Sequence, residues 1–217
     1  MDAESWHGRL SSGHWYRHLP APLQHSLLAN ARVRQLAAGQ VLFKRGDPPC
    51  GLYAVLDGNL RISAVNEQGK EALLSLAQAP FWFGEIAVFD GLPRTHDACA
   101  VEPCTLLQVP QSAILHLLAQ SPAYWRDMAL LMSQKLRLTF ISIEQLSLAP
   151  ASVRVAHRLW MIAEGYGEID GSRRVVQLAQ EDLAAMLGVS RQTTNTLLKA
   201  LQEQGVVRFG YGEIEIL

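Results

Sequence analysis

The spacing of hydrophobic residues changes twice along the chain. The first 38 residues predict short helical pieces broken at Gly8, Gly13, Pro20 and Pro22. From Gly39 onward, short β-rich runs alternate with turns that contain Gly, Pro and Asn, a pattern typical of an antiparallel barrel or sandwich. These runs are VLFKRG, GLYAVLDG, NLRISAV, ALLSLA and TLLQVP.

The middle of the chain predicts a long helix over residues 123–148, after a shorter helix between Pro110 and Pro122. Apolar positions recur along it at steps of 3, 4, 3, 4 and 3, the spacing that pairs two helices in a coiled coil. The positions of this seam are Ala129, Met132, Leu136, Thr139, Ile143 and Leu146, of which Thr139 is polar. A second apolar face is predicted to pack on the chain's own barrel through Leu131, Leu138, Phe140 and Ile141. A helix that is apolar on two sides favours a homodimer.

A break at Ala149-Pro150 separates the long helix from an amphipathic helix over residues 151–165. A short helix follows at Gln180–Leu187, then Gly188 for a tight turn and Ser190 as a cap for the next helix. That helix buries Thr194, Leu197, Leu198 and Leu201, which gives a helix-turn-helix. Two short β runs around a glycine turn, in QEQGVVRFGYGEIEIL, add the wing of a winged helix.

The second helix of this unit carries polar residues that its own packing does not use. They are Arg191, Gln192, Asn195, Thr196 and Lys199, next to Ser190. A recognition helix inserts this end into the major groove, where Arg reads guanine and Gln or Asn reads adenine. The alternative is an ordinary solvated helix face, and the predicted wing favours DNA recognition.

Charge gives no general sign of nucleic-acid binding, because the net charge of the chain is −1. From residue 150 onward, Lys and Arg number 7 and Asp and Glu number 8. Phosphate affinity grows with the number of cationic contacts, so a monomeric unit is predicted to bind DNA weakly. The chain has neither a membrane-spanning run nor an apolar leader, which predicts a cytoplasmic protein.

The sequence gives weaker indications of a metal, haem, redox or catalytic site. Cys50, Cys99 and Cys104 lack metal-ligand spacing and predict buried free thiols. His14 and His18 stand one helical turn apart and could share a metal or a haem, although no third ligand has a clear spacing, so no metal is predicted. The sequence has no nucleophile–base set or Walker loop, which argues against an enzyme.

Three motifs in this order resemble the CRP/FNR family of bacterial transcription regulators. LAAGQVLFKRGDPPCGLYAVLDGNLRI is similar to the family's first barrel strands, FGEIAVFDGLPRT to its phosphate-binding cassette, and LAQEDLAAMLGVSRQTTNTLLKALQEQGVV to its DNA-reading unit. The resemblance implies an α+β fold in three parts. These are an antiparallel β-roll (jelly-roll) sensor domain over 1–121, a dimerisation helix over 122–149 and a winged helix-turn-helix over 150–217.

The cassette makes chemical sense for a cyclic nucleotide. Gly84 allows close backbone approach, and Arg94 offers a planar cationic fork suited to a phosphate. By the resemblance, Glu85 would hold the ribose of cAMP or cGMP, Arg94 and Thr95 its cyclic phosphate, and Thr139 its base. The alternative is an Arg94–Glu85 ion pair that braces an empty barrel.

Two residues close to the predicted ligand contacts depart from the pattern of the family's cAMP-binding members. Phe140 stands where a small polar residue would reach the base across the dimer, and Asp97 would repel a phosphate if it faced inward. His96 could tune the cavity with pH or fill it.

The resemblance also implies the partners: a second copy of the chain, a two-fold symmetric duplex and RNA polymerase. Arg191 matches the family's guanine-reading arginine, whereas Gln192 and Thr196 replace its acidic base reader and its second arginine. The predicted function is an effector-gated, dimeric DNA-binding regulator. The alternatives are a haem or redox sensor, or an effector-independent member that acts through a protein partner.

Overall fold

The computed structural model describes residues 3–69 and 71–217. The chain begins with three short helices, α1 (Ala3–Leu10), α2 (His14–Arg17) and α3 (Ala21–Ala29). Two of the predicted breaks are wrong: Gly8 lies inside α1, and Pro22 lies in the first turn of α3, where its missing N–H costs nothing. The strand-rich region also begins before Gly39, at β1 (Arg32–Leu36).

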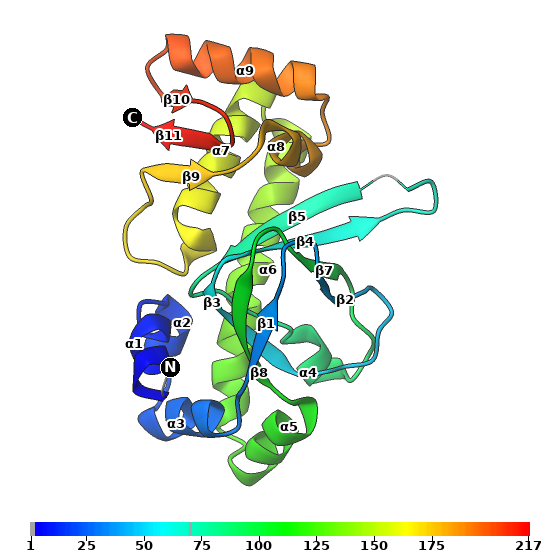
Figure 1. Ribbon diagram of the computed structural model, residues 1–217, viewed down its shortest axis with the longest axis vertical. Coiled ribbons are helices and arrows are strands. Elements are labelled where there is room, and N and C mark those ends of the chain that lie inside the picture. Colours follow the sequence, from blue (N-terminus) through cyan, green and yellow to red (C-terminus); the bar gives the residue numbers. More distant parts are fainter. Residues whose placement is uncertain (1–2, 70) are drawn as a thin grey trace.

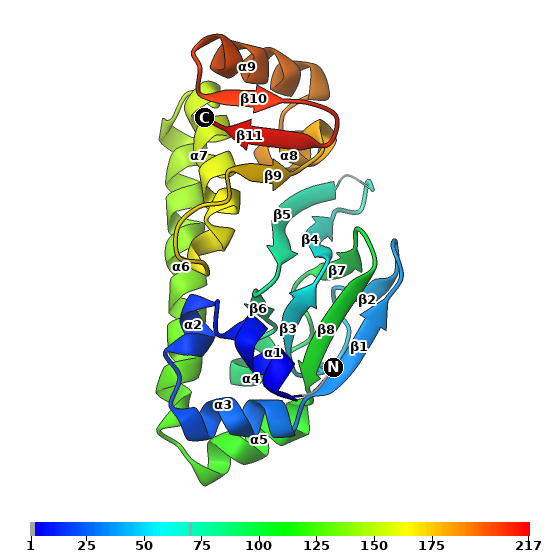
Figure 2. The ribbon, with the colours of Figure 1, turned by 60° about the vertical axis from the view of Figure 1, so that its left-hand side comes forward.

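Two four-stranded antiparallel sheets form a β-roll (Figure 2). The strand orders are β1-β8-β3-β6 and β2-β7-β4-β5. All five predicted runs are strands, and β1, β6 and β7 were not predicted. The remaining bounds are β2 (Val41–Phe43), β3 (Leu52–Asp57), β4 (Asn59–Val65), β5 (Glu71–Gln78), β6 (Trp82–Phe83), β7 (Asp97–Ala100) and β8 (Cys104–Val109).

The short helices α4 (Ile86–Asp90) and α5 (Gln111–Gln120) lead to the long helix α6 (Tyr124–Leu148), which runs along one side of the molecule (Figure 2). Leu131 is buried and Leu138 is half-buried against the β-roll, as predicted. The prediction for the other two residues of that face is wrong. Phe140 is 62% exposed, because it lies about 200° around the helix from Leu138, and Ile141, about 60° to the side of Leu138, is 39% exposed.

The C-terminal unit consists of α7 (Ala151–Ala163), the 3₁₀ turn η1 (Gly165–Gly167), α8 (Gln180–Leu187), α9 (Arg191–Glu203) and a small sheet. The sheet has the order β10-β11-β9. Its strands are β9 (Val175–Gln177), which was not predicted, β10 (Val207–Phe209) and β11 (Glu213–Ile216). The helix-turn-helix and its wing are therefore present. Helix α9 lies at the end of the molecule farthest from α3 and α5 (Figure 1).

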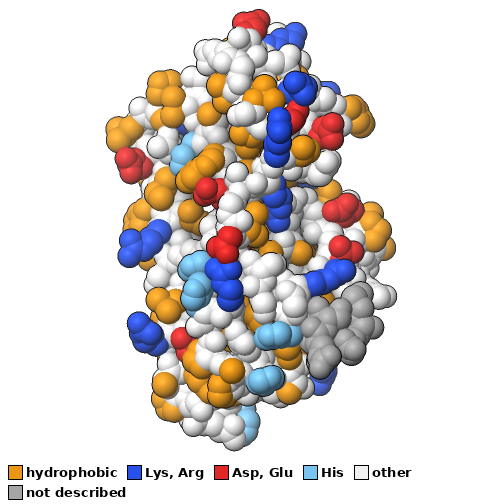
Figure 3. All heavy atoms as spheres, turned by 90° about the vertical axis from the view of Figure 1, so that its left-hand side faces the viewer, with side chains coloured by type: hydrophobic (Ala, Val, Ile, Leu, Met, Phe, Trp, Pro, Cys, Tyr) orange, Lys and Arg blue, Asp and Glu red, His pale blue; other side chains and the backbone are white. Residues whose placement is uncertain are grey.

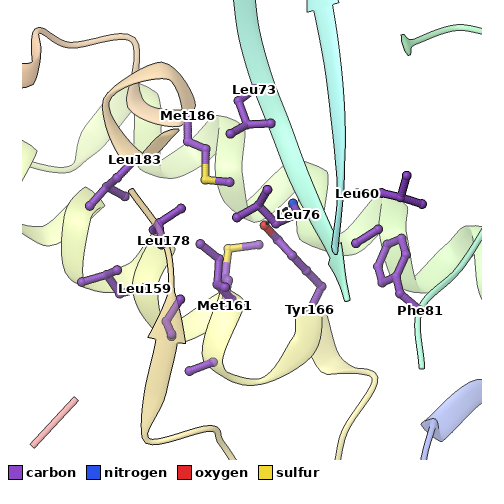
Figure 4. Close-up of a cluster of buried hydrophobic side chains, with 14 of the residues drawn as sticks. Leu60, Leu73, Leu76, Phe81, Leu159, Met161, Tyr166, Leu178, Leu183 and Met186 are labelled. Carbon is purple, nitrogen blue, oxygen red and sulfur yellow. Dashed lines mark hydrogen bonds between the residues drawn. The ribbon is translucent and has the colours of Figure 1, made fainter. Parts of the chain in front are cut away.

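The hydrophobic core continues from the β-roll into the C-terminal unit. In Figure 4, Tyr166 reaches from the turn after α7 toward β5, and Met186 of α8 faces Leu73 of the same strand. The Leu76 amide donates a hydrogen bond to Tyr166 Oη at 3.3 Å. A separate cluster joins the N-terminal helices to the outer face of the roll, where Tyr16 stacks on Trp82 with ring centroids 5.6 Å apart.

Polar contacts also join the β-roll to the C-terminal unit. Arg61 of β4 forms an ion pair with Asp182 of α8. The Arg173 guanidinium donates to Gln78 Oε1 at 2.6 Å and to Ala79 O at 2.9 Å. The first contact holds α8, the first helix of the helix-turn-helix, against β4, and the Arg173 contacts tie the segment before β9 to the end of β5.

Candidate effector cavity and DNA-binding surface

A cavity of about 640 Å³ lies between the β-roll, α6 and the C-terminal unit. Its volume falls within the range that small-molecule sites occupy. All five residues predicted to bind an effector line it: Gly84, Glu85, Arg94, Thr95 and Thr139. Its wall extends to Met186, Leu187 and Gly188, so the cavity reaches the turn of the helix-turn-helix.

Gly84 is required by close packing as well as by its backbone angle. Its φ is +100°, a conformation that L side chains rarely adopt. A Cβ atom at this position would lie 2.7 Å from Gly51 O and 2.8 Å from Arg94 Nη1. Glycine therefore allows the cassette backbone to contact the guanidinium group directly.

Arg94 is held in a fixed orientation by the roll. The side chain is 5% exposed, and its guanidinium lies over the Phe43 ring at 4.6 Å. Nη1 donates to Gly84 O at 3.2 Å, and Nη2 donates to Gly51 O at 2.5 Å and contacts Cys50 Sγ at 3.0 Å. Nε is buried and has no hydrogen-bond partner among the described residues. A buried donor without an acceptor is costly, and Arg94 as a whole lines the cavity.

Glu85 has a partner that the sequence analysis missed. Its carboxylate, 4% exposed, accepts a hydrogen bond from Lys135 Nζ of α6 at 2.7 Å. Lys135 Nζ also donates to Trp82 O at 2.7 Å and lies 4.9 Å from the centroid of the Phe81 ring. The suggested Arg94–Glu85 ion pair is wrong, because each of the two residues is bound to other groups.

The smaller polar residues near the cassette have local partners. Thr139 is exposed, and its Oγ1 donates to Lys135 O at 2.9 Å, one turn back on its own helix. Thr95 Oγ1 and His96 Nδ1 are 2.8 Å apart, and burial lowers the pKa of His96 below its usual value. Asp97 does not line the cavity, since its Oδ1 accepts the Arg45 amide at 2.7 Å.

The second helix of the helix-turn-helix begins as predicted. Gly188 has a φ of +65°, and Ser190 Oγ accepts the Thr193 amide at 3.0 Å. Thr194, Leu198 and Leu201 are buried, whereas Leu197 is only half-buried. The cap and the buried face fix the direction in which the leading end of α9 points.

The residues predicted to contact DNA share the outer side of α9 with one exception. Those that are exposed are Ser190, Arg191, Gln192, Thr196 and Lys199. Asn195 is half-buried, and its Oδ1 has no described hydrogen-bond partner. Thr196 Oγ1 donates back to Gln192 O at 3.1 Å. Arg191 Nη1 forms an ion pair with Glu181 Oε1 of α8 at 2.7 Å, a contact that the sequence analysis did not anticipate.

The surface shown in Figure 3 mixes hydrophobic, basic and acidic side chains. In the C-terminal unit, Arg174 and Arg208 both pair with Glu215, at 3.0 and 2.9 Å. Acidic neighbours thus lie beside basic residues near the wing, which agrees with the balanced charge of this unit.

The histidines and cysteines considered for metal, haem or redox sensing have the following environments. The rings of His14 and His18 lie 4.4 Å apart, and His18 Nδ1 bonds to His14 O at 2.7 Å. Among the side chains that the structure describes, no group of three or more His, Cys, Asp or Glu could hold a metal ion. The thiols are free, but only Cys104 is buried, contrary to the prediction for all three.

None of the described helices has the length and apolar character needed to cross a bilayer.

Comparison with protein families matches both halves of the chain. Residues 33–121 match the cyclic nucleotide-binding domain, and residues 153–217 match the Crp-like helix-turn-helix domain. The cyclic AMP receptor protein of Thermus thermophilus is 32% identical over 90% of this chain and 92% of its own length. A CRP-like cAMP-activated global transcriptional regulator of Mycobacterium tuberculosis is 28% identical over 78% of this chain and 77% of its own.

Solved structures have the same architecture. A CRP/FNR-family transcriptional regulator from Thermus thermophilus is 29% identical, with a TM-score of 0.67 over 86% of this chain and 93% of its own. The c-di-GMP-responsive global regulator CLP of Xanthomonas campestris, 20% identical, has a TM-score of 0.72 over 91% of this chain and 99% of its own, and shows the fold. This chain belongs to the CRP/FNR family of transcription regulators, with a cyclic nucleotide-binding domain and a DNA-binding helix-turn-helix.

Proposed function

We propose that this regulator is a homodimer that binds cAMP or cGMP in its cavity and reads a two-fold symmetric DNA site with paired α9 helices. In this proposal residues 1–121 sense the effector, 122–149 dimerise and 150–217 bind DNA in concert with RNA polymerase. The observation that carries it is that the five predicted effector residues line one cavity whose wall also includes α6 and the end of α8.

Cyclic nucleotide binding is supported by the presence of Arg94 in the cavity wall. Its planar cationic group suits a phosphate oxygen in the cavity. Glu85 can accept a hydrogen bond from a ribose hydroxyl with the carboxylate oxygen that Lys135 does not use. The cAMP-dependent relatives named above support the same effector class.

Gating follows from where the cavity lies. A ligand that contacts the roll, α6 and Met186 favours one placement of α8 on the roll over others. If the DNA-competent dimer binds the ligand more tightly, ligand binding shifts the population toward it. The two α9 helices then lie about one duplex turn apart, on the same side.

Dimerisation is supported by exposed apolar residues of α6. Leu136 is 51% exposed and Ile143, which also borders the cavity, is 53% exposed, and both belong to the predicted coiled-coil seam. A row of half-exposed apolar residues along a helix is favourable in water only when a partner covers it.

The proposal is tested by isothermal titration calorimetry of cAMP and cGMP into the wild-type protein and three variants. Arg94→Ala removes the guanidinium, Arg94→Lys keeps the charge without the fork, and Arg45→Ala removes an exposed arginine outside the cavity wall. We expect one nucleotide to bind the wild type and Arg45→Ala equally, and both Arg94 variants at least about tenfold more weakly. No heat from either nucleotide with the wild type contradicts cyclic nucleotide binding.

A second candidate is a family member that needs no effector. It is supported by the protein partners that Arg94 and Glu85 already have. In this case the wild type binds DNA with the same affinity with and without either nucleotide.

A further inference from the structure

We propose that Glu181 is a positioning residue that orients Arg191 for base reading and keeps it off the phosphates. This inference rests on the proposed DNA-binding function and adds a specificity-determining residue on α8. Its basis is the ion pair between Arg191 Nη1 and Glu181 Oε1, 2.7 Å apart.

The geometry leaves Arg191 able to read a base. The pair engages Nη1, whereas Nε and Nη2 form the other edge of the guanidinium that carries two parallel donors. That edge can bond to O6 and N7 of a guanine at the same time. Glu181 can therefore hold one side of the planar group while the other side faces the groove.

The pair has little value for folding. The side chains of Arg191 and Glu181 are 69% and 68% exposed, and ion pairs exposed to water contribute little to folding stability. Its neighbour Asp182 is used differently, because it is bound to Arg61 of the β-roll. Of these two adjacent acids, one ties α8 to the roll and the other contacts the residue proposed to read DNA.

The carboxylate also affects binding to the DNA backbone. Arg191 at the leading end of α9 could contact a phosphate on any sequence, which would strengthen non-specific binding. Glu181 competes for that contact and repels nearby phosphates. The pair therefore lowers affinity for all DNA but raises the ratio between the correct and the wrong base at one position in each half-site.

The test begins with sites selected from randomised duplexes by the wild-type, full-length protein, with the effector if calorimetry identifies one. Binding of the best site, of duplexes changed at single base pairs and of random DNA is then measured at several salt concentrations. The variants are Glu181→Gln, Arg191→Ala and the double variant. Glu203→Gln removes one exposed charge at the other end of α9 and serves as the matched control.

We expect Arg191→Ala to lose about tenfold or more of the discrimination at one base pair per half-site. Glu181→Gln should lose about threefold or more at the same base pair and bind random DNA more tightly. Its salt dependence should steepen by about 0.9 per subunit, because Arg191 then contacts a phosphate. In the Arg191→Ala background the Glu181 change should not alter base preference.

Failure of the inference and failure of the proposed function give different results. If Arg191→Ala loses discrimination but Glu181→Gln keeps it and only binds all DNA more tightly, as Glu203→Gln does, Glu181 has no positioning role. If Arg191→Ala itself leaves discrimination intact, the proposed reading role of Arg191 is wrong, and the inference fails with it.

Discussion

Lys135 of the long helix α6 and Glu85 of the cassette form an ion pair, with Nζ and Oε2 2.7 Å apart. The pair joins the helix proposed to dimerise to the loop proposed to hold an effector. A ligand that hydrogen-bonds to the Glu85 carboxylate contacts the partner of an α6 residue, which gives effector binding a physical route to the dimer.

Removing Lys135 should destabilise the protein, because it leaves the buried Glu85 carboxylate without its cation. For Lys135→Ala we expect a loss of roughly 3 kcal/mol in the free energy of unfolding, measured by urea denaturation at neutral pH. The double variant Lys135→Ala/Glu85→Gln serves as the control and should recover part of the loss, because it no longer buries a lone charge. Equal stability of Lys135→Ala and the wild type contradicts a buried, paired carboxylate.

Glu168 should make stability depend on pH. It is 2% exposed, and burial raises its pKa to about 7 from 4.5, against the opposing effects of Lys135 and of the Trp15 amide. From about pH 4.5 to 7 the unfolded state loses this proton while the folded state keeps it. The folded state therefore binds more protons, and this group's contribution to stability falls as the pH rises through that range.

The measurement is urea denaturation of the wild type and of Glu168→Gln from pH 4.5 to 8. Relative to the variant, the wild type should lose up to roughly 3 kcal/mol between pH 4.5 and 7 and little more above. A difference between the two proteins that stays constant with pH is incompatible with a buried, protonated Glu168.

The glycines of the cassette should differ in their tolerance of a side chain. Gly84→Ala places a Cβ against Gly51 O and the Arg94 guanidinium, whereas a Cβ at Gly91, φ +67°, meets nothing within 4 Å. We expect Gly91→Ala to cost about 1 kcal/mol and Gly84→Ala roughly 3 kcal/mol or more, together with weaker nucleotide binding. Thermal unfolding compares them, and equal losses would show that backbone conformation alone requires Gly84.

Charges in the α6 seam should separate the subunits. In Leu136→Glu/Ile143→Glu, like charges from two helices face each other, which disfavours pairing. Sedimentation velocity should change from twice the 24.0-kDa chain mass to a single chain. Leu130→Glu is the control, since Leu130 is 50% exposed and lies roughly 120° around the helix from Leu136. A monomeric wild type, or a dimeric double variant, contradicts the seam.

The sequence predicted element bounds well where burial of one face gives the apolar residues a regular spacing. Strand β4, with its apolar and polar alternation, and helix α8 were predicted with the bounds that the structure gives. The missed strands have no such signal. Strand β6 has only two residues, Trp82 and Phe83, and β1 lies at a sheet edge with four of its five residues exposed.

The site residues also divide into those that a local sequence pattern could place together and those that only tertiary packing brings together. Gly84 and Arg94 lie in one cassette motif, so a local pattern could place them together. The partners Lys135 and Glu181 are 50 and 10 positions from Glu85 and Arg191. Lysine and glutamate on helices predict a solvated face by default, and only the packing of α6 on the roll and of α8 on α9 brings them to these sites.

The central claim is that two copies of the chain place two Arg191-tipped helices on one duplex. Its most direct test is the site that the full-length protein selects from randomised duplexes, together with the number of chains bound to that site in analytical ultracentrifugation. We expect an inverted repeat, with half-site centres about 10 base pairs apart, bound by two chains. A single chain bound to a non-repeated site, or no enrichment of any sequence with or without cyclic nucleotide, would contradict it.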